Sequence, residues 1–445
     1  MTLILLALLA CLFLVEFPRE RKKQEADLNA KKVFSLDEAA VKAIQIRYPD
    51  RVIQLEKNPE NRWQITNPLI AEADDREVKS VLSTVVDMRL TRVVEERNQD
   101  PAQYGFDHPP VEVTLILPDK EEQVIIGNDG PVANTLYVKR GSDQRVMLAE
   151  QWVKGSLVRT LFDLRNKNVL PMDRDKVAEL KLDFPKLGFL MAKERSDSGG
   201  QWRLKAPKTL KADDDTISNL LLLLQNLRAT GFIDNEQEKS ATRKEFKKAE
   251  LTVSLRDEGK DHSVSFYRTK EKGVLLAVTT PDRPLYRISD AVLTDFKPDL
   301  FYYQDKRLLA LDQEKVQGIE VKTASEFYRL KQTSGVWFIE GEPGELDTDA
   351  VTRFLSHLTV VKAQQQPDSP ILPVAAGLDP PATEVKLMDA SGQTLGALKV
   401  GSEAQGMLYA MGVPELGITL ISKDILDNIP KKSELIKPKP KENNG

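Results

Sequence analysis

The residues best suited to chemistry are few and are scattered along the chain. Its three histidines, His108, His262 and His357, have no metal-ligand companion at helical or loop spacing, so they predict no metal site. His262 and Ser263 are adjacent in a predicted strand and therefore point to opposite faces. The single cysteine, Cys11, lies in an apolar stretch, where it cannot serve as a soluble nucleophile.

Carboxylates are the remaining candidates for enzymatic chemistry, and their densest cluster has a structural explanation. Asp213-Asp214-Asp215 opens a predicted helix, where the helix dipole favours negative charge, so we expect these residues to cap the helix. The chain contains no G-x-x-x-x-G-K-[ST] loop, which excludes it as the ATPase of a transporter. It also lacks the G-x-G-x-x-G, G-x-S-x-G and H-E-x-x-H patterns. We therefore expect a protein without catalytic residues, metal ligands or a cofactor.

Length and charge bound the number of domains and the class of partner. With 445 residues the chain is too long for one ordinary hydrophobic core, so two to four domains are expected. A formal net charge of −4 argues against a nucleic acid partner, because phosphate neutralisation requires a basic surface. One cysteine excludes an intramolecular disulfide framework and a thiolate zinc site.

Three parts of the chain share a pattern that starts at a tryptophan. A proline follows each tryptophan after five or six residues, and an aspartate after ten or eleven. The pairs are Trp63 with Asp74, Trp202 with Asp213, and Trp337 with Asp347. Apolar residues spaced i, i+3, i+4, i+7 then predict an amphipathic helix that the aspartate caps. The apolar sets are Val78, Val81, Leu82 and Val85; Ile217, Leu220, Leu221 and Leu224; and Val351, Phe354, Leu355 and Leu358.

The segments before and after this pattern also recur. An alternating strand precedes each tryptophan, and an aspartate precedes each strand: Asp37 before AIQIRY, Asp173 before ELKLDF, and Asp312 before GIEVKT. Downstream, the first and third copies share a glycine-proline turn, a strand, a second strand that ends in glycine, and a third strand with a tyrosine. These features are Tyr104 to Pro110, Gly127 and Tyr137, and Ala376 to Pro381, Gly401 and Tyr409. The second copy has lost the turn but keeps the strands.

The repeats predict an α+β protein made of three tandem antiparallel-sheet-plus-helix modules. Each module has antiparallel strands, one amphipathic helix, a meander of three or four strands and a short closing helix. The expected boundaries are a membrane anchor at 1–18, a charged stalk at 19–32, modules at 33–164, 165–303 and 304–430, and a disordered tail at 431–445. The module at 165–303 is the degenerate copy. Repeated features of this kind favour a role in packing over three active sites.

The N-terminus predicts attachment to a membrane. Residues 2–15 (TLILLALLACLFLV) carry no charge, but as a helix they span about 21 Å, short of the roughly 30 Å hydrocarbon core. A transmembrane anchor is the favoured interpretation. The alternatives are a signal peptide, against which stands the absence of a basic region before the apolar run, and a lipoprotein attached through Cys11. The basic residues that follow the run would place the body in the cytoplasm by the positive-inside rule.

The arrangement resembles the DUF4340 family, a domain of unknown function. The resemblance rests on the order and spacing of the Trp63 to Asp74 segment, the Tyr104 to Pro110 turn, Ile126-Gly127 with Tyr137, Asp305 to Leu309, and Gly377 to Pro381. Members resemble bacterial single-pass or lipid-anchored envelope proteins associated with an ABC transport system of the gliding-motility auxiliary type. The resemblance therefore implies an inner-membrane protein with a periplasmic body and a transport-complex partner, and it brings no catalytic residues.

These observations lead to one expected function and two alternatives. The expected function is that of a non-catalytic, membrane-anchored accessory or scaffold protein of an ABC-type transport or envelope complex. One alternative is an extracytoplasmic hydrolase, which on a glycan would need two carboxylates about 5 to 9.5 Å apart. The other is a ligand-binding module with a pocket between the first and third copies.

Overall fold

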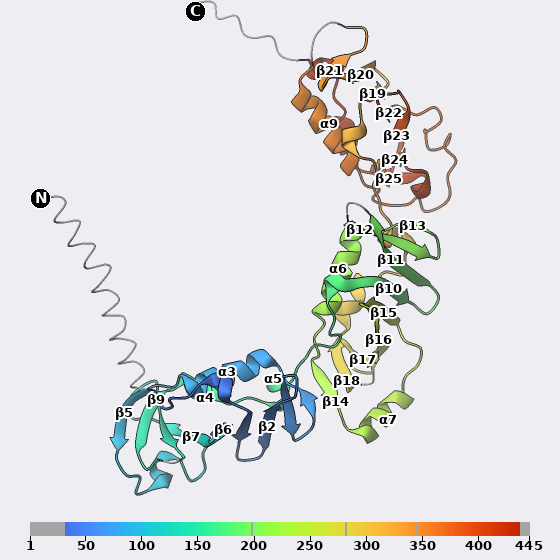
Figure 1. The fold of residues 1–445 in the computed structure, drawn as a ribbon. Coiled ribbons are helices and arrows are strands. Elements are labelled where there is room, and N and C mark those ends of the chain that lie inside the picture. The colour runs from blue at the N-terminus through green and yellow to red at the C-terminus, as the bar shows by residue number, and fades with distance from the viewer. Residues whose placement is uncertain (1–31, 142, 197–198, 281–282, 343–345, 437–445) are drawn as a thin grey trace, which may run out of the picture. The chain divides into compact units, whose positions relative to one another are not determined.

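The computed structural model describes residues 32–436, apart from residues 142, 197–198, 281–282 and 343–345 (Figure 1). The predicted membrane anchor, including Cys11, and the stalk up to residue 31 lie outside the described residues. None of the helices in the described part combines the length and apolar character needed to cross a bilayer. The chain divides into two compact units, which meet between Asn168 and Val169.

The described residues form three antiparallel sheets in chain order, which confirms the predicted α+β class (Figure 1). The first sheet has the strand order β4-β3-β2-β1-β6-β7-β8-β9-β5. Its strands are β1 (Ala43–Arg47), β2 (Val52–Lys57), β3 (Trp63–Asn67), β4 (Ala71–Glu72), β5 (Leu90–Glu95), β6 (Val111–Ile116), β7 (Glu121–Asp129), β8 (Thr135–Arg140) and β9 (Val146–Glu150). Its helices are η2 (Glu38–Ala40), α3 (Asp75–Val86), η3 (Pro101–Tyr104), α4 (Trp152–Leu157) and α5 (Leu161–Leu164).

The second sheet repeats this topology strand for strand, in the order β13-β12-β11-β10-β15-β16-β17-β18-β14. Its strands are β10 (Val177–Asp183), β11 (Gly188–Ser196), β12 (Gly199–Ala206), β13 (Leu210–Lys211), β14 (Gly231–Ile233), β15 (Leu251–Asp257), β16 (Lys260–Arg268), β17 (Val274–Thr280) and β18 (Leu285–Ser289). Its helices are η4 (Arg174–Lys176), α6 (Asp214–Gln225), α7 (Glu236–Lys244), η5 (Asp290–Asp295) and α8 (Leu300–Tyr303).

The third sheet keeps the central strands of the other two, in the order β21-β20-β19-β22-β23-β24-β25. Its strands are β19 (Gly318–Lys322), β20 (Phe327–Thr333), β21 (Val336–Ile339), β22 (Thr383–Met388), β23 (Thr394–Ala404), β24 (Met407–Met411) and β25 (Thr419–Ile421). Its helices are η6 (Gln313–Lys315), α9 (Thr348–Val360), η7 (Pro414–Leu416), α10 (Asp424–Asp427) and η8 (Lys432–Glu434).

Each sheet buries one face under its long helix, as the apolar spacing predicted. All twelve predicted helix positions are at most 6% exposed, from Val78 in α3 to Leu358 in α9. They belong to three separate cores, one for each copy. The three aspartates upstream of the first strands cap the 3₁₀ helices η2, η4 and η6. The pattern therefore identified the core-facing stripe of every long helix.

The glycines of the first and third copies differ from their predicted role as strand ends. β7 continues past Gly127 to Asp129, and β23 continues past Gly401 to Ala404, with a register shift at each glycine. A Cβ atom on Gly127 would lie 2.2 Å from the carbonyl oxygen of Tyr104, and one on Gly401 would lie 2.1 Å from that of Ala376. The glycines are there because the backbone of the glycine-proline turn packs directly on the strand.

The tail begins later than predicted. Residues 431–436 were assigned to a disordered tail, but they form η8 and a bridge between Ile436 and Leu346. Leu435 is fully buried in the third core, and the Tyr328 hydroxyl donates a hydrogen bond to the Pro430 carbonyl. Burial of this one leucine outweighs the proline- and lysine-rich composition around it. Residues 437–445 lie outside the described part.

Gly127→Ala tests the packing of the turn. We expect the substitution to lower the free energy of unfolding of the first unit by about 1–3 kcal/mol, because the added methyl group overlaps the Tyr104 carbonyl. Hydrogen exchange of β6 to β8 measures the effect in this unit alone. Gly155→Ala in α4 is the matched control, since its Cβ would meet no atom within 4 Å. Equal exchange in both variants would contradict this account.

Candidate functional site

The histidines occupy three different copies and unlike environments. His108 is exposed in the turn after η3, and His357 is exposed on α9 with its Nδ1 2.7 Å from the Asn428 side-chain oxygen. His262 is half-buried on β16, and its Nε2 atom is buried without a hydrogen-bond partner. In the part of the chain that the structure describes, no group of three or more His, Cys, Asp or Glu residues could hold a metal ion.

The aspartate cluster opens α6 and caps it, as predicted. The Asp213 carboxylate accepts a hydrogen bond of 2.9 Å from the Thr216 backbone N–H, and that of Asp214 accepts one of 2.9 Å from Trp202. Asp74 caps α3 through the N–H of Arg76, and Asp347 caps α9 through that of Asp349. A side-chain oxygen at this position satisfies N–H groups that the first helical turn leaves free.

The C-terminal end of each copy packs back against the capping aspartate of that copy's own long helix. The segments involved, here called return segments, are Leu164–Asn166, Tyr303–Asp305 and Leu435–Ile436. Their carbonyl groups accept the backbone N–H of the cap: Asp74 to Leu164 at 2.8 Å, Asp213 to Tyr303 at 2.9 Å, and Asp347 to Leu435 at 2.9 Å. A single bridge follows in each copy, between Ala73 and Arg165, Ala212 and Gln304, and Leu346 and Ile436. One tertiary contact is thus used three times.

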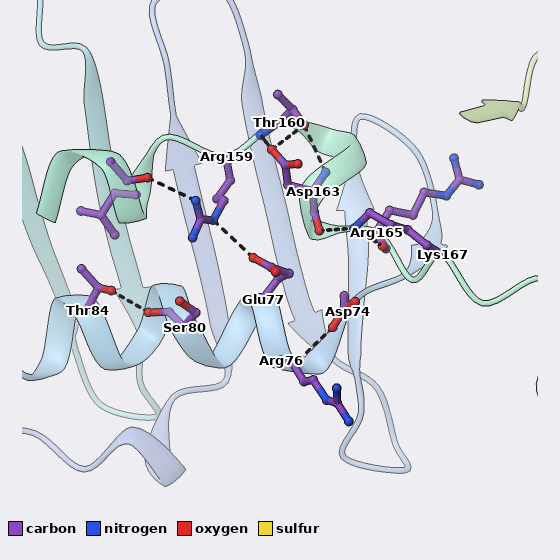
Figure 2. Close-up of polar contacts among 12 residues, drawn as sticks. Asp74, Arg76, Glu77, Ser80, Thr84, Arg159, Thr160, Asp163, Arg165 and Lys167 are labelled. Atoms are coloured by element: carbon purple, nitrogen blue, oxygen red, sulfur yellow. Dashed lines mark hydrogen bonds and ion pairs between the residues drawn. The ribbon is translucent and has the colours of Figure 1, made fainter. Parts of the chain in front are cut away.

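The first return segment is held by local polar contacts (Figure 2). Thr160 and Asp163 form a reciprocal capping box around α5, and the Thr160 hydrogen bonds hold the pKa of the Asp163 carboxyl below its ordinary value. Lys167 donates to the Asp163 carbonyl at 2.8 Å. An ion pair of 3.4 Å between Arg159 and Glu77 ties the segment before α5 to α3. The contacts in Figure 2 therefore anchor the segment beside the start of α3.

The second return segment carries a stronger ion pair. The Arg307 guanidinium donates two hydrogen bonds to the Asp305 carboxylate, from Nη2 at 2.6 Å and from Nε at 3.0 Å. Lys211 lies 3.7 Å from the same carboxylate, which is 9% exposed. Burial alone would raise the pKa of Asp305, but the bonds and charge of Arg307, with help from Lys211, outweigh it and lower the pKa. Asp305 therefore stays ionised.

Further cations surround the cap of α6. Lys362, which follows α9 in the third copy, has its Nζ atom 3.9 Å from the carboxylates of both Asp213 and Asp215. Lys306 donates to the Tyr302 carbonyl at 2.9 Å, and burial lowers the pKa of its ammonium group. We call Lys211, Asp213, Asp305, Lys306, Arg307 and Lys362 the joint cluster. It links the second copy to the third within one compact unit.

A cavity of about 250 Å³ lies beside the joint cluster. Its polar lining includes Arg203, Lys211, Asp305, Arg307 and Glu415. The carboxylate of Asp305 is already neutralised inside the protein, since Arg307 occupies both of its oxygens. General acid catalysis at neutral pH requires a carboxyl group with a raised pKa, and that of Asp305 is lowered. Asp305 thus suits an ion pair within the protein better than general acid catalysis.

The sequence analysis predicted the helix caps but not the joint cluster. The signal it missed is a short segment that recurs at the end of the first and second copies. Asn166-Lys167-Asn168 and Asp305-Lys306-Arg307 are equivalent, because the side chain of the first residue accepts the N–H of the third in both. The two hydrogen bonds measure 3.0 Å and 3.1 Å. Alignment of the copies through their C-terminal ends could have revealed this match.

Asp213→Ala tests the cap. We expect it to destabilise α6 by about 1–2 kcal/mol, because both the helix N-terminus and the Lys362 ammonium lose a partner. Asp215→Ala is the matched control, with a side chain in the same helical turn that is 88% exposed, and we expect it to have little effect. Hydrogen exchange of α6 in the full chain distinguishes the two. Equal destabilisation by both would show that total charge, not the cap, matters.

Asp305→Asn tests the ion pair through its pH dependence. The folded-state pKa of Asp305 is lowered, so its contribution is complete above the unfolded pKa of about 3.9 and is lost as the pH falls through the folded value. We expect the variant to unfold more easily than the wild type at pH 7 by about 1–3 kcal/mol. The difference in free energy of unfolding between the variant and the wild type should become smaller below about pH 4. Urea denaturation followed by tryptophan fluorescence measures this difference. A difference that does not change with pH would contradict the role of the ionised Asp305 carboxylate.

Comparison with known families agrees with the repeat. A family model described as Domain of unknown function (DUF4340) matches residues 63–247 and again residues 202–370. The two matches begin at Trp63 and Trp202, which are equivalent residues of the first two copies, and together they cover more than half of the chain. No curated protein sequence matches the chain. The chain belongs to the DUF4340 family, a domain of unknown function.

Proposed function

We propose that the protein is a non-catalytic, membrane-tethered accessory or scaffold protein of an ABC-type transport or envelope complex. The observation that carries the proposal is the threefold use of the capping aspartates, each bonded to a helix N-terminus and to a return segment. Asp213 and Asp214, from the densest carboxylate cluster in the sequence, are therefore engaged in folding. The product of that folding is a series of similar bodies with distinct surfaces, which suits binding of several partners.

The tether and the partner rest on the sequence. The uncharged run at residues 2–15 supports attachment to a membrane. The resemblance of the sequence to envelope proteins supports a transport complex as partner and a periplasmic body. We propose a single-pass anchor in the inner membrane. The alternative of lipid attachment at Cys11 would leave the scaffold role unchanged.

Affinity purification from crosslinked membranes tests the proposal. The bait is the full chain with a C-terminal tag, and the matched control carries residues 1–32 fused to an unrelated soluble domain. We expect the permease or ATPase of a transporter, or another envelope component, to be enriched on the full chain over the control. Recovery of the same proteins on both baits would mean that the folded body contributes no binding, and the proposal would fail.

A further inference from the structure

The second copy carries a tyrosine where the other two carry glycine. The strand registers establish that these three positions are equivalent. In each copy, the residue just before the glycine or tyrosine pairs with the first residue of the preceding strand. The pairs are Ile126 with Val111, Phe266 with Leu251, and Val400 with Thr383. The next residues are Gly127, Tyr267 and Gly401. The glycine that the first and third copies need is thus replaced by a large aromatic residue in the second.

This replacement is incompatible with the glycine-proline turn. In the first and third copies a carbonyl of the turn occupies the space that even a Cβ atom would need. In the second copy the chain between β14 and β15 instead forms α7, and Phe246 follows it. The Phe246 ring stacks on Tyr267, with centroids 4.2 Å apart and planes 7° from parallel. Loss of the turn and gain of the aromatic pair are therefore two parts of one change.

A groove lies where α7 approaches the sheet. Its volume is about 770 Å³, and Ile233, Phe246, Tyr267 and Leu276 form its apolar part. These residues belong to a small apolar cluster that is separate from the main core of the second copy. Phe246 and Tyr267 are only half-buried. An apolar surface of this kind, concave and edged by charge, is typical of a site for another molecule.

The charge at the groove is positive. Five basic residues and three glutamates line it, and each glutamate is paired within the protein. The ion pairs are Glu245 with Lys270 at 3.1 Å, Glu250 with Arg268 at 3.4 Å, and Glu271 with Arg287 at 2.8 Å. Lys248 donates a hydrogen bond to the Pro185 carbonyl, whereas Lys247 is exposed and has no carboxylate partner among the described residues. The groove therefore complements negative charge, although the chain as a whole carries −4.

We propose that this groove docks an acidic segment of a partner protein, which places an apolar side chain against the Phe246–Tyr267 pair and its carboxylates near Lys247. The proposal deepens the scaffold role and rests on it for the source of the partner. The second copy is then the one specialised for binding, while the first and third copies keep the closed turn.

Peptide binding to the full chain tests the groove. The probes are two fluorescein-labelled 12-residue peptides with the same central Leu-Phe-Leu, one flanked by Asp and Glu and the other by Lys. Fluorescence anisotropy should show that the acidic peptide binds and that added salt weakens it. Phe246→Ala and Lys247→Glu should each weaken binding at least about tenfold. Lys208→Glu, an exposed lysine of the same copy outside the groove, should bind like the wild type.

The outcomes separate this proposal from the scaffold role. No binding of the acidic peptide, equal binding of both peptides, or unchanged affinity in Phe246→Ala and Lys247→Glu would each overturn the groove assignment. Transporter subunits recovered on the full chain would still support the scaffold role. Because Lys247 is exposed, we expect its substitution to change stability by less than about 0.5 kcal/mol, and an unchanged thermal unfolding midpoint would confirm that loss of binding is not due to unfolding.

Discussion

The structure of each copy depends on one hydrogen bond, which the backbone N–H of the capping aspartate donates to a carbonyl group at the end of that copy. That N–H group precedes the first turn of the long helix, and leaving it unbonded in a buried place costs about 1–3 kcal/mol. The return carbonyl that satisfies it comes from about ninety residues later, at Leu164, Tyr303 or Leu435. One hydrogen bond thus joins the C-terminal end of every copy to the start of its long helix. The aspartate side chain completes the cap from the other direction.

The other end of each long helix receives the start of its own copy. Val33 donates to Met88, Val169 to Leu227, and Leu308 to Val361, at 2.9, 3.1 and 3.0 Å. Because both ends of each long helix are held by these hydrogen bonds, the sequence of the strands that follow the helix can differ between copies. The second copy shows how far this goes, since Tyr267 and α7 replace the glycine and the turn without disturbing the order of its strands. The joint cluster adds charge only where the second copy meets the third.

Features set by neighbouring residues could be read from the sequence, and features set by distant ones could not. The cap and the buried stripe of α9, for example, follow from residues within about three helical turns of Asp347. Gly127 was read as a strand end because its true constraint, the carbonyl of Tyr104, lies more than twenty residues away. Leu435 was assigned to a tail because composition carries no information about a core formed by earlier strands. The Phe246–Tyr267 pair required the strand register, which only the fold supplies.

Residue-resolved hydrogen exchange at the three capping aspartates is the most direct measurement of this closure. If the return segments close every copy, the amides of Asp74, Asp213 and Asp347 exchange as slowly as those of the sheets they join. Exchange at the rate of an unstructured peptide at any of the three, while the adjoining sheet stays protected, would contradict the account.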